Sequence, residues 1–160
     1  MAVQYARRMG FRVIAVGRGT EIAEDVKSLG AHIYVDNTKD RPAAKLEELG
    51  AQAIIATIGN PEEVSALLGG LAPRGQLVLL GTGKDPLPVS PGHMVVGERG
   101  ILGSITGSPL ESEKTLGFSV LTGVRPRIET MPFEQVNEAY QRMKSGGVKF
   151  RMVLTMKRAG

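Results

Sequence analysis

The chain has 160 residues, which is room for one domain of ordinary size. Hydrophobic residues make up 42% of it and charged residues 22%, so we expect a soluble globular core and exclude disorder as the main state. No apolar run approaches the roughly 18 residues of a membrane-spanning helix, and the absence of cysteine excludes disulfides, thiolate metal sites and a cysteine nucleophile. The net charge of +4 comes from basic residues spread along the chain, and aromatic residues reach only 4%, so we expect no nucleic-acid partner and no membrane association.

The first predicted element is a helix over residues 2–9, in which Ala2, Ala6 and Met9 share one face. No capping residue precedes this helix, and no secretory signal with a long apolar core is recognisable. We therefore expect a cytoplasmic protein whose domain begins inside a helix, as a truncated chain would.

Four apolar runs follow at intervals of about twenty residues, each preceded by one or two glycines. The runs cover residues 12–16, 32–35, 52–57 and 76–80, with Gly10, Gly30, Gly50 and Gly69–Gly70 before them. The runs are continuous rather than alternating, which is typical of strands buried on both faces of a parallel sheet. A glycine at the end of the preceding helix supplies the left-handed conformation that often ends a helix.

Helices are predicted between these strands. Thr20 predicts the cap of a helix that reaches Leu29, and Asp40 precedes a helix that reaches Leu49. Asn60 is followed by a proline and two glutamates, the pattern of an N-cap with proline at the first helical position.

After residue 80 the apolar runs no longer recur about every twenty residues. We predict a Gly/Pro-rich loop over 81–98, a strand over 100–105, a helix over 109–122, a short strand over 126–131, a helix over 133–143 and a last strand over 150–156. No linker or low-complexity tract divides the chain, so residues 1–160 form one domain. Its fold class is α/β, a Rossmann-like doubly wound parallel sheet.

In such sheets, ligands bind at the carboxyl ends of the strands. The first apolar run ends in Gly17, Arg18 and Gly19. Nicotinamide-dinucleotide domains usually carry an acid here that binds the adenosine ribose 2′-hydroxyl, whereas glycine and arginine leave space and positive charge for a 2′-phosphate. A surface arginine in a turn is the alternative.

Glycines also follow the later strands. They belong to Thr57–Ile58–Gly59, to Leu80–Gly81–Thr82 and to a segment over Gly103, Ser104 and Ile105. Glycine at these points allows a dinucleotide to approach the backbone, but tight turns would explain it nearly as well. Two isolated histidines, His32 and His93, make no metal site, and neither a Walker-type loop nor a nucleophile elbow is present.

Five stretches carry a resemblance to a known family. They are MAVQYARRMGFRVIAVGRG, SLGAHIYVDN, GGLAPRGQLVLLGTG, GILGSITGS and MPFEQVNEAYQRMKSGGVKFRMVL. In this order and spacing they resemble the cofactor-binding, C-terminal domain of zinc-type medium-chain alcohol dehydrogenases, over nearly the whole chain.

The resemblance implies a set of cofactor contacts. Gly17 and Arg18, with Gly19 beside them, would meet the adenosine ribose or its phosphate. Thr57, Ile58 and Gly59 would lie along the cofactor, Leu80, Gly81 and Thr82 near the nicotinamide ribose, and Gly103, Ser104 and Ile105 at the carboxamide. Arg151 looks like the arginine that reaches the pyrophosphate. The cofactor implied is NADP(H) in preference to NAD(H).

The sequence departs from the family in two respects. Family members carry a strand and a G-x-G-x-x-G turn immediately before the helix that begins here at residue 2, and that strand is the central one of the sheet. We therefore expect an incomplete sheet in which strands 12–16 and 52–57 lack their partner. The catalytic domain that supplies the zinc ligands is also absent, so zinc is expected only in that domain of the parent enzyme.

We therefore expect the NADP(H)-binding domain of an alcohol dehydrogenase-like oxidoreductase, with no catalytic residue and no activity by itself. One alternative is a non-catalytic Rossmann-like module that assembles through an exposed sheet edge, with a possible homodimer through residues 100–105. The other is a fragment of a zinc-free quinone-reductase-type enzyme.

Overall fold

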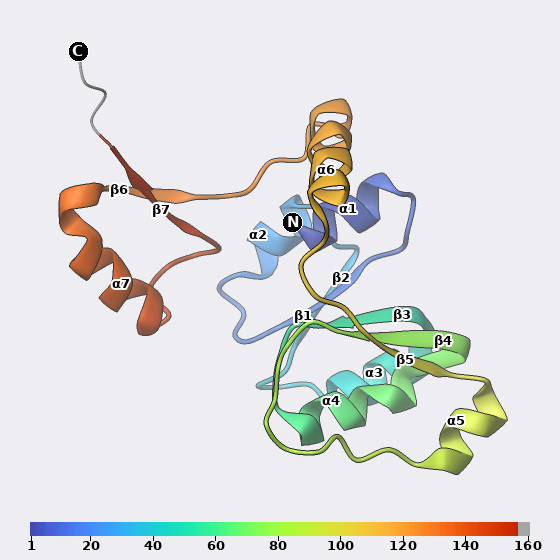
Figure 1. Ribbon diagram of the computed structural model, residues 1–160. Helices are drawn as coiled ribbons and strands as arrows, with labels where there is room; N and C mark the ends of the chain where they lie inside the picture. The colour runs from blue at the N-terminus through green and yellow to red at the C-terminus, as the bar shows by residue number, and fades with distance from the viewer. Residues whose placement is uncertain (157–160) are drawn as a thin grey trace.

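The computed structural model describes residues 1–156, and its elements alternate between helix and strand (Figure 1). The strands are β1 (Ile14–Gly17), β2 (Ile33–Asp36), β3 (Ala51–Ala56), β4 (Leu71–Leu79), β5 (Gly100–Gly103), β6 (Glu129–Pro132) and β7 (Met152–Thr155). The α-helices are α1 (Ala2–Arg8), α2 (Ala23–Ser28), α3 (Pro42–Leu49), α4 (Pro61–Leu67), α5 (Pro91–Gly97), α6 (Pro109–Thr122) and α7 (Val136–Lys144). Short 3-10 turns, η1 (Leu68–Gly70) and η2 (Phe133–Gln135), precede β4 and α7.

All strand pairs are parallel, and the sheet is split. Strands β1 and β2 pair with each other, and β3, β4 and β5 form a second sheet in that order. Within the described residues β1 and β3 do not pair, which is the interruption that the expected loss of a central strand predicts. The expected α/β fold with parallel strands is thus confirmed.

The main core lies on one face of the β3–β4–β5 sheet, where α3 and α4 cover it (Figure 1). Leu77 of β4 is completely buried among Leu46 of α3, Val64 of α4 and Ile54 of β3. The opposite face is more open, because Ile55, in register with Leu102 through Val78, is 50% exposed and Leu102 is 54% exposed.

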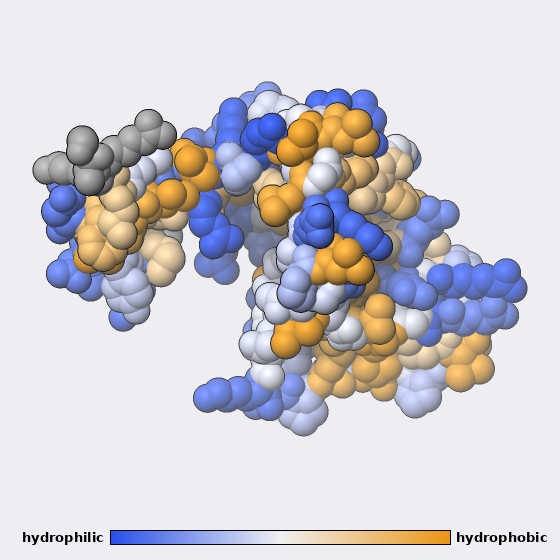
Figure 2. Space-filling model, turned by 45° about the horizontal axis from the view of Figure 1, so that its top comes forward, coloured by the Kyte–Doolittle hydropathy of each residue, from blue (hydrophilic) through white to orange (hydrophobic). Residues whose placement is uncertain are grey.

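Helices α1 and α6 pack against each other. The hydroxyls of Tyr5 and Ser119 lie 2.6 Å apart, and the rings of Tyr5 and Phe118 are 5.9 Å apart between centroids. The outer side of α6 is apolar, and hydrophobic surface is visible in this part of the molecule in Figure 2. Leu116, Val120 and Leu121 there are between 67% and 83% exposed.

The remaining elements β6, α7 and β7 form a C-terminal lobe to one side of the sheets (Figure 1). Within the lobe, Arg142 of α7 pairs with Glu129 of β6 at 2.7 Å. The lobe is joined to α2 through Asp25, whose carboxylate binds Arg127 and, at 3.1 Å, Lys149. These ion pairs place the lobe beside the helix that follows β1.

Several predicted boundaries were wrong. The predicted loop over 81–98 contains α5, because Pro91 at a first helical position starts the helix, which ends where Glu98 turns left-handed at φ 49°. Thr20 does not cap α2, which begins later, after Ile22. The strand predicted over 100–105 ends at Gly103.

Two other helix starts have side-chain caps. Asn60 caps α4 as predicted, since its side chain accepts a hydrogen bond from the Glu63 N–H at 2.9 Å. Ser108 and Glu111 form a capping box at the start of α6, which was not predicted from the sequence. Within residues 1–156, no helix is long and apolar enough to cross a membrane.

Candidate cofactor site

Three of the predicted cofactor segments follow neighbouring strands at one edge of the sheet. Ala56, Leu79 and Gly103 end β3, β4 and β5 in register, so the segments 57–59, 80–82 and 103–105 emerge side by side. The backbone joins them, because Leu80 N–H donates to Ala56 O at 2.9 Å and Ser104 N–H donates to Leu79 O at 3.0 Å. The structure therefore brings these nine residues together, as the parallel order predicts.

Gly59 and Gly81 each pack against the backbone of the other segment. A β-carbon built on Gly59 would lie 2.8 Å from Thr82 O, and one built on Gly81 would lie 2.5 Å from the carbonyl carbon of Ile58. Real β-carbons do not approach backbone atoms this closely. The close approach thus gives Gly59 and Gly81 a role in the contact between two turns, which is the alternative the sequence left open.

Gly103 differs from these two. A β-carbon built on it would meet no atom within 4 Å, so space is open beside the end of β5. Nothing inside the described protein requires a glycine there. This open space is what a bound ligand at the strand edge would need.

The turn after β1 is held from β2. Gly17 and Asp36 are paired in register, and the Gly19 N–H donates to Asp36 Oδ1 at 2.8 Å. The Tyr34 hydroxyl donates to Gly19 O at 2.7 Å, and Gly19 has the left-handed φ of 81° that favours glycine. Tyr34 also closes the space above Gly17, where a β-carbon would lie 2.8 Å from its hydroxyl. The Gly17–Gly19 turn is therefore fixed at both of its glycines.

Asp36 is the buried anchor of this turn, with 4% of its surface exposed. Its Oδ1 accepts from Gly19 N–H, from Thr38 N–H at 3.0 Å and from the Thr38 hydroxyl at 2.8 Å. The hydrogen bond from the Thr38 backbone, ahead of the others, holds the pKa of Asp36 below its ordinary value despite burial. Within residues 1–156, Oδ2 has no hydrogen-bond partner.

Neither Tyr34 nor Asp36 was predicted from the sequence as a site residue. The signal available was an acidic residue at the end of β2, followed two residues later by a threonine, which is the pattern of an Asx turn. That pattern predicts a turn, but it does not tell which neighbouring loop the carboxylate binds.

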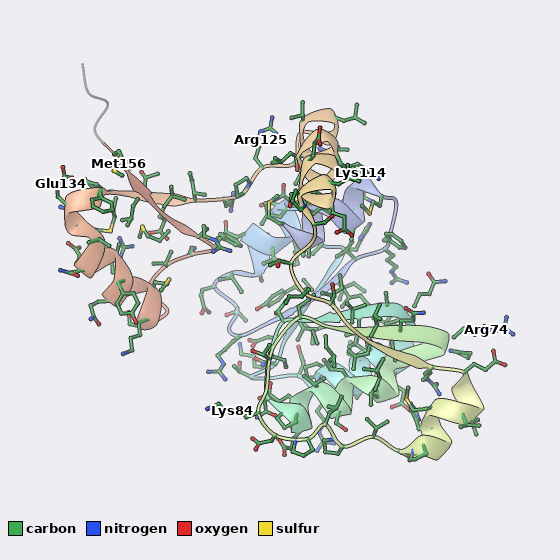
Figure 3. The ribbon with its side chains drawn as sticks, in the orientation of Figure 1. Arg74, Lys84, Lys114, Arg125, Glu134 and Met156 are labelled. Atoms are coloured by element: carbon green, nitrogen blue, oxygen red, sulfur yellow. The ribbon has the colours of Figure 1, made fainter. Side chains whose placement is uncertain are left out.

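Arg18 lies between the two fixed glycines and is exposed. Among the residues that the structure describes, no carboxylate forms an ion pair with it. Other exposed basic side chains lie elsewhere on the sheet: Lys84 follows the end of β4, whereas Arg74, paired with Glu98 at 2.7 Å, lies at the opposite end (Figure 3).

Arg151 is not at the strand edge with the other predicted residues. It precedes β7 in the C-terminal lobe, where its carbonyl accepts from Glu129 N–H at 2.8 Å. The nearby Lys149 binds Asp25 of α2, so the lobe segment that carries Arg151 is attached to the helix following the Gly17–Gly19 turn.

Both histidines have structural partners. His32 Nδ1 lies 2.9 Å from the Val13 N–H that donates to it, and His93 Nε2 lies 3.1 Å from Leu68 O. Within residues 1–156, no group of three or more His, Cys, Asp or Glu side chains is placed to hold a metal ion.

Several known proteins similar to this chain are named as dehydrogenases. The family model described as zinc-binding dehydrogenase matches residues 1–120. Alcohol dehydrogenase patD of Penicillium expansum is 36% identical over 157 residues, which cover 98% of this chain and 46% of that protein. An alcohol dehydrogenase of Geobacillus stearothermophilus is 31% identical over 159 residues, 98% of this chain and 47% of that protein.

Solved structures agree with these relatives. The alcohol dehydrogenase of the archaeon Aeropyrum pernix superposes with a TM-score of 0.85 at 25% identity, over 96% of this chain and 45% of that one. The CAD of Helicobacter pylori, solved as a complex with NADP(H), superposes with a TM-score of 0.79 at 27% identity, over 100% of this chain and 45% of that one. The chain spans about half the length of the relatives that it matches. It belongs to the zinc-binding dehydrogenase family, and it corresponds to the cofactor-binding domain of the zinc-type medium-chain alcohol dehydrogenases.

Proposed function

We propose that this chain is the NADP(H)-preferring cofactor domain of an alcohol dehydrogenase-like oxidoreductase. In the complete enzyme, hydride would pass between an alcohol or aldehyde and the nicotinamide. The observation that carries the proposal is the fixed Gly17–Arg18–Gly19 turn at the carboxyl end of β1.

The residues of this turn fit the adenosine end of NADP(H). Gly17 stands where an acid would bind the ribose 2′-hydroxyl, and the glycine removes a negative charge from that position. Arg18 is exposed beside it and, within the described residues, has no competing carboxylate partner. A planar guanidinium suits the two phosphate oxygens that it would bind.

The other end of the cofactor would lie along the neighbouring strand ends. The open space at Gly103 would take the carboxamide, with Ser104 and Ile105 beside it. The cofactor would lie against two segments, Thr57–Gly59 and Leu80–Thr82, whose backbones are already in contact with each other. Arg151, carried by the lobe attached to α2, would reach the pyrophosphate. When bound, the nicotinamide would supply the hydride chemistry, and this domain would orient it.

The residues present do not fit a catalytic zinc ion. The sequence contains no cysteine and two histidines, both engaged with backbone groups. No zinc step can therefore be assigned to this chain, and we expect it to show no dehydrogenase activity by itself. An ordinary turnover rate with alcohol and NADP would contradict this expectation.

Calorimetric titration with NADPH and NADH tests the cofactor preference. We expect weak binding with NADPH ahead of NADH, and an Arg18→Ala variant that loses about tenfold or more of its NADPH affinity with little change for NADH. Arg74→Ala is the control, because Arg74 is an exposed arginine at the opposite end of the sheet (Figure 3). Tighter binding of NADH, or an unchanged NADPH affinity in Arg18→Ala, would overturn the proposal.

A second candidate function follows from the split sheet. In the described residues, β1, β3 and β5 each have one edge that pairs with no other strand. Such edges pair readily with another strand, so the chain would assemble with a second copy or with a separate strand. Light scattering after size exclusion separates the candidates: a dimer that binds no nucleotide favours this module, and a monomer that binds NADPH favours the cofactor domain.

A further inference from the structure

A carboxylate lies directly against the turn proposed to receive the 2′-phosphate. Glu21 follows the turn by two residues, and its carboxyl carbon lies 2.6 Å from where a β-carbon of Gly19 would be. Glu21 thus occupies the side of Gly19 that a side chain would otherwise fill. The side chain is exposed, and within the described residues it forms no ion pair.

The turn cannot move away from this carboxylate without losing its anchors. Gly19 N–H is bound to Asp36 Oδ1 and Gly19 O to the Tyr34 hydroxyl, both from β2. The charge of Glu21 also acts on Tyr34, which binds the turn. Burial first, then Asp36 and then Glu21 raise the pKa of the Tyr34 hydroxyl. Arg18, within the anchored turn, and Glu21, beside it, therefore have opposite charges.

Asp36, the other carboxylate near Gly19, is not available to a ligand. Its side chain is 4% exposed, and Oδ1 already accepts three hydrogen bonds. Its other oxygen has no contact with solvent. Of the two carboxylates that flank Gly19, Glu21 is the one open to a ligand.

We propose that Glu21 is a specificity-determining residue that opposes Arg18: its carboxylate repels a 2′-phosphate and favours a 2′-hydroxyl, from which it can accept a hydrogen bond. Acidic side chains select the unphosphorylated ribose in dinucleotide domains for this reason. Here the acid comes from the segment after the Gly17–Gly19 turn rather than from the strand end, where Gly17 stands. Arg18 and Glu21 together then set a modest NADPH preference instead of a strict one. This inference rests on the proposed function of the turn.

The test uses ligands that contain only the adenosine end. 2′,5′-ADP carries the 2′-phosphate and 5′-AMP lacks it, so the ratio of their dissociation constants reports on this turn without hydride transfer. Glu21→Gln keeps the size of the side chain and removes its charge. We expect the variant to bind 2′,5′-ADP about tenfold more tightly, to bind 5′-AMP equally or more weakly, and to show a smaller gain at high salt.

Glu24→Gln is the matched control, with the same change of charge three residues further along on α2, where Glu24 pairs with Lys27 at 3.2 Å. An equal gain in both variants would mean a general charge effect and would overturn the inference. So would an unchanged ratio in Glu21→Gln while Arg18→Ala still weakens 2′,5′-ADP binding. Loss of the Arg18 effect would instead overturn the proposed function, and absence of 2′,5′-ADP binding in all variants would overturn both.

Discussion

Gly81→Ala should lower the stability of the fold, whereas Gly103→Ala should leave the fold stable and weaken cofactor binding. Both glycines were predicted to lie at the cofactor site for the same reason, that glycine allows a close approach to the backbone. At Gly81 the new methyl group would lie 2.5 Å from the Ile58 carbonyl carbon and 3.0 Å from that of Thr57, both backbone atoms. Since a backbone cannot rotate away as a side chain can, the turns after β3 and β4 must separate. Overpacking of this kind typically costs about 1–3 kcal/mol of folding free energy.

At Gly103 the methyl group would meet nothing within 4 Å, and the backbone has no left-handed conformation that disfavours alanine. We therefore expect unchanged stability or a gain of about 0.5 kcal/mol, because alanine has less conformational entropy to lose in a strand. The same methyl group would occupy the open space proposed for the carboxamide. Gly103→Ala should therefore weaken NADPH binding while leaving the fold intact.

Urea unfolding followed by circular dichroism measures the stabilities, and calorimetric titration measures NADPH binding by the folded variants. A Gly81→Ala variant as stable as the parent would refute the close approach of the two turns. A Gly103→Ala variant that loses as much stability as Gly81→Ala would refute the open space beside β5. Unchanged NADPH affinity in Gly103→Ala would remove that residue from the proposed site.

Two further predictions concern stability. Leu77→Ala should lower the free energy of unfolding by about 3–5 kcal/mol, because Leu77 is completely buried. Leu116→Ala, at a site 67% exposed, should change the free energy of unfolding by less than about 0.5 kcal/mol. Equal urea midpoints for the two variants would contradict the assigned core. Asp25→Asn should make the C-terminal lobe more sensitive to limited proteolysis at pH 7, since Lys149 and then Arg127 bind the carboxylate and lower its pKa in the folded state. The stabilisation from a lowered carboxyl pKa is present above the ordinary value of 3.8 and lost as pH falls through the folded pKa. The two chains should therefore converge in acid, and identical cleavage at pH 7 would show that Asp25 does not hold the lobe.

Much of the architecture follows from local sequence patterns. Continuous apolar runs separated by predicted helices indicate parallel strands, because strands covered on both faces carry apolar residues at successive positions. In the described residues one face of the β3–β4–β5 sheet remains more open, with Ile55 and Leu102 about half exposed. The strand order then predicts that segments 57–59, 80–82 and 103–105 share one edge, and the register of β3, β4 and β5 bears this out. Within the described residues β1 and β3 do not pair with each other, as was expected from the sequence.

Local patterns did not predict α5, because Gly and Pro in residues 81–98 are typical of loops. Only the structure shows that Pro91 stands at the first turn of a helix, where proline is tolerated. Composition cannot distinguish these two uses of proline, since the difference lies in the conformation of the residues that follow.

The roles of individual site residues depended on tertiary contacts. Gly81 and Gly103 look alike in the sequence, yet one faces the backbone of a neighbouring turn and the other faces open space. Asp36 binds Gly19 across 17 positions only because β1 and β2 lie in register. The sequence by itself therefore determined the family, the parallel order and the edge that carries the candidate site. The tertiary structure decided which glycines hold two turns together and that Asp36 is buried against Gly19, because those contacts join segments that are distant along the chain.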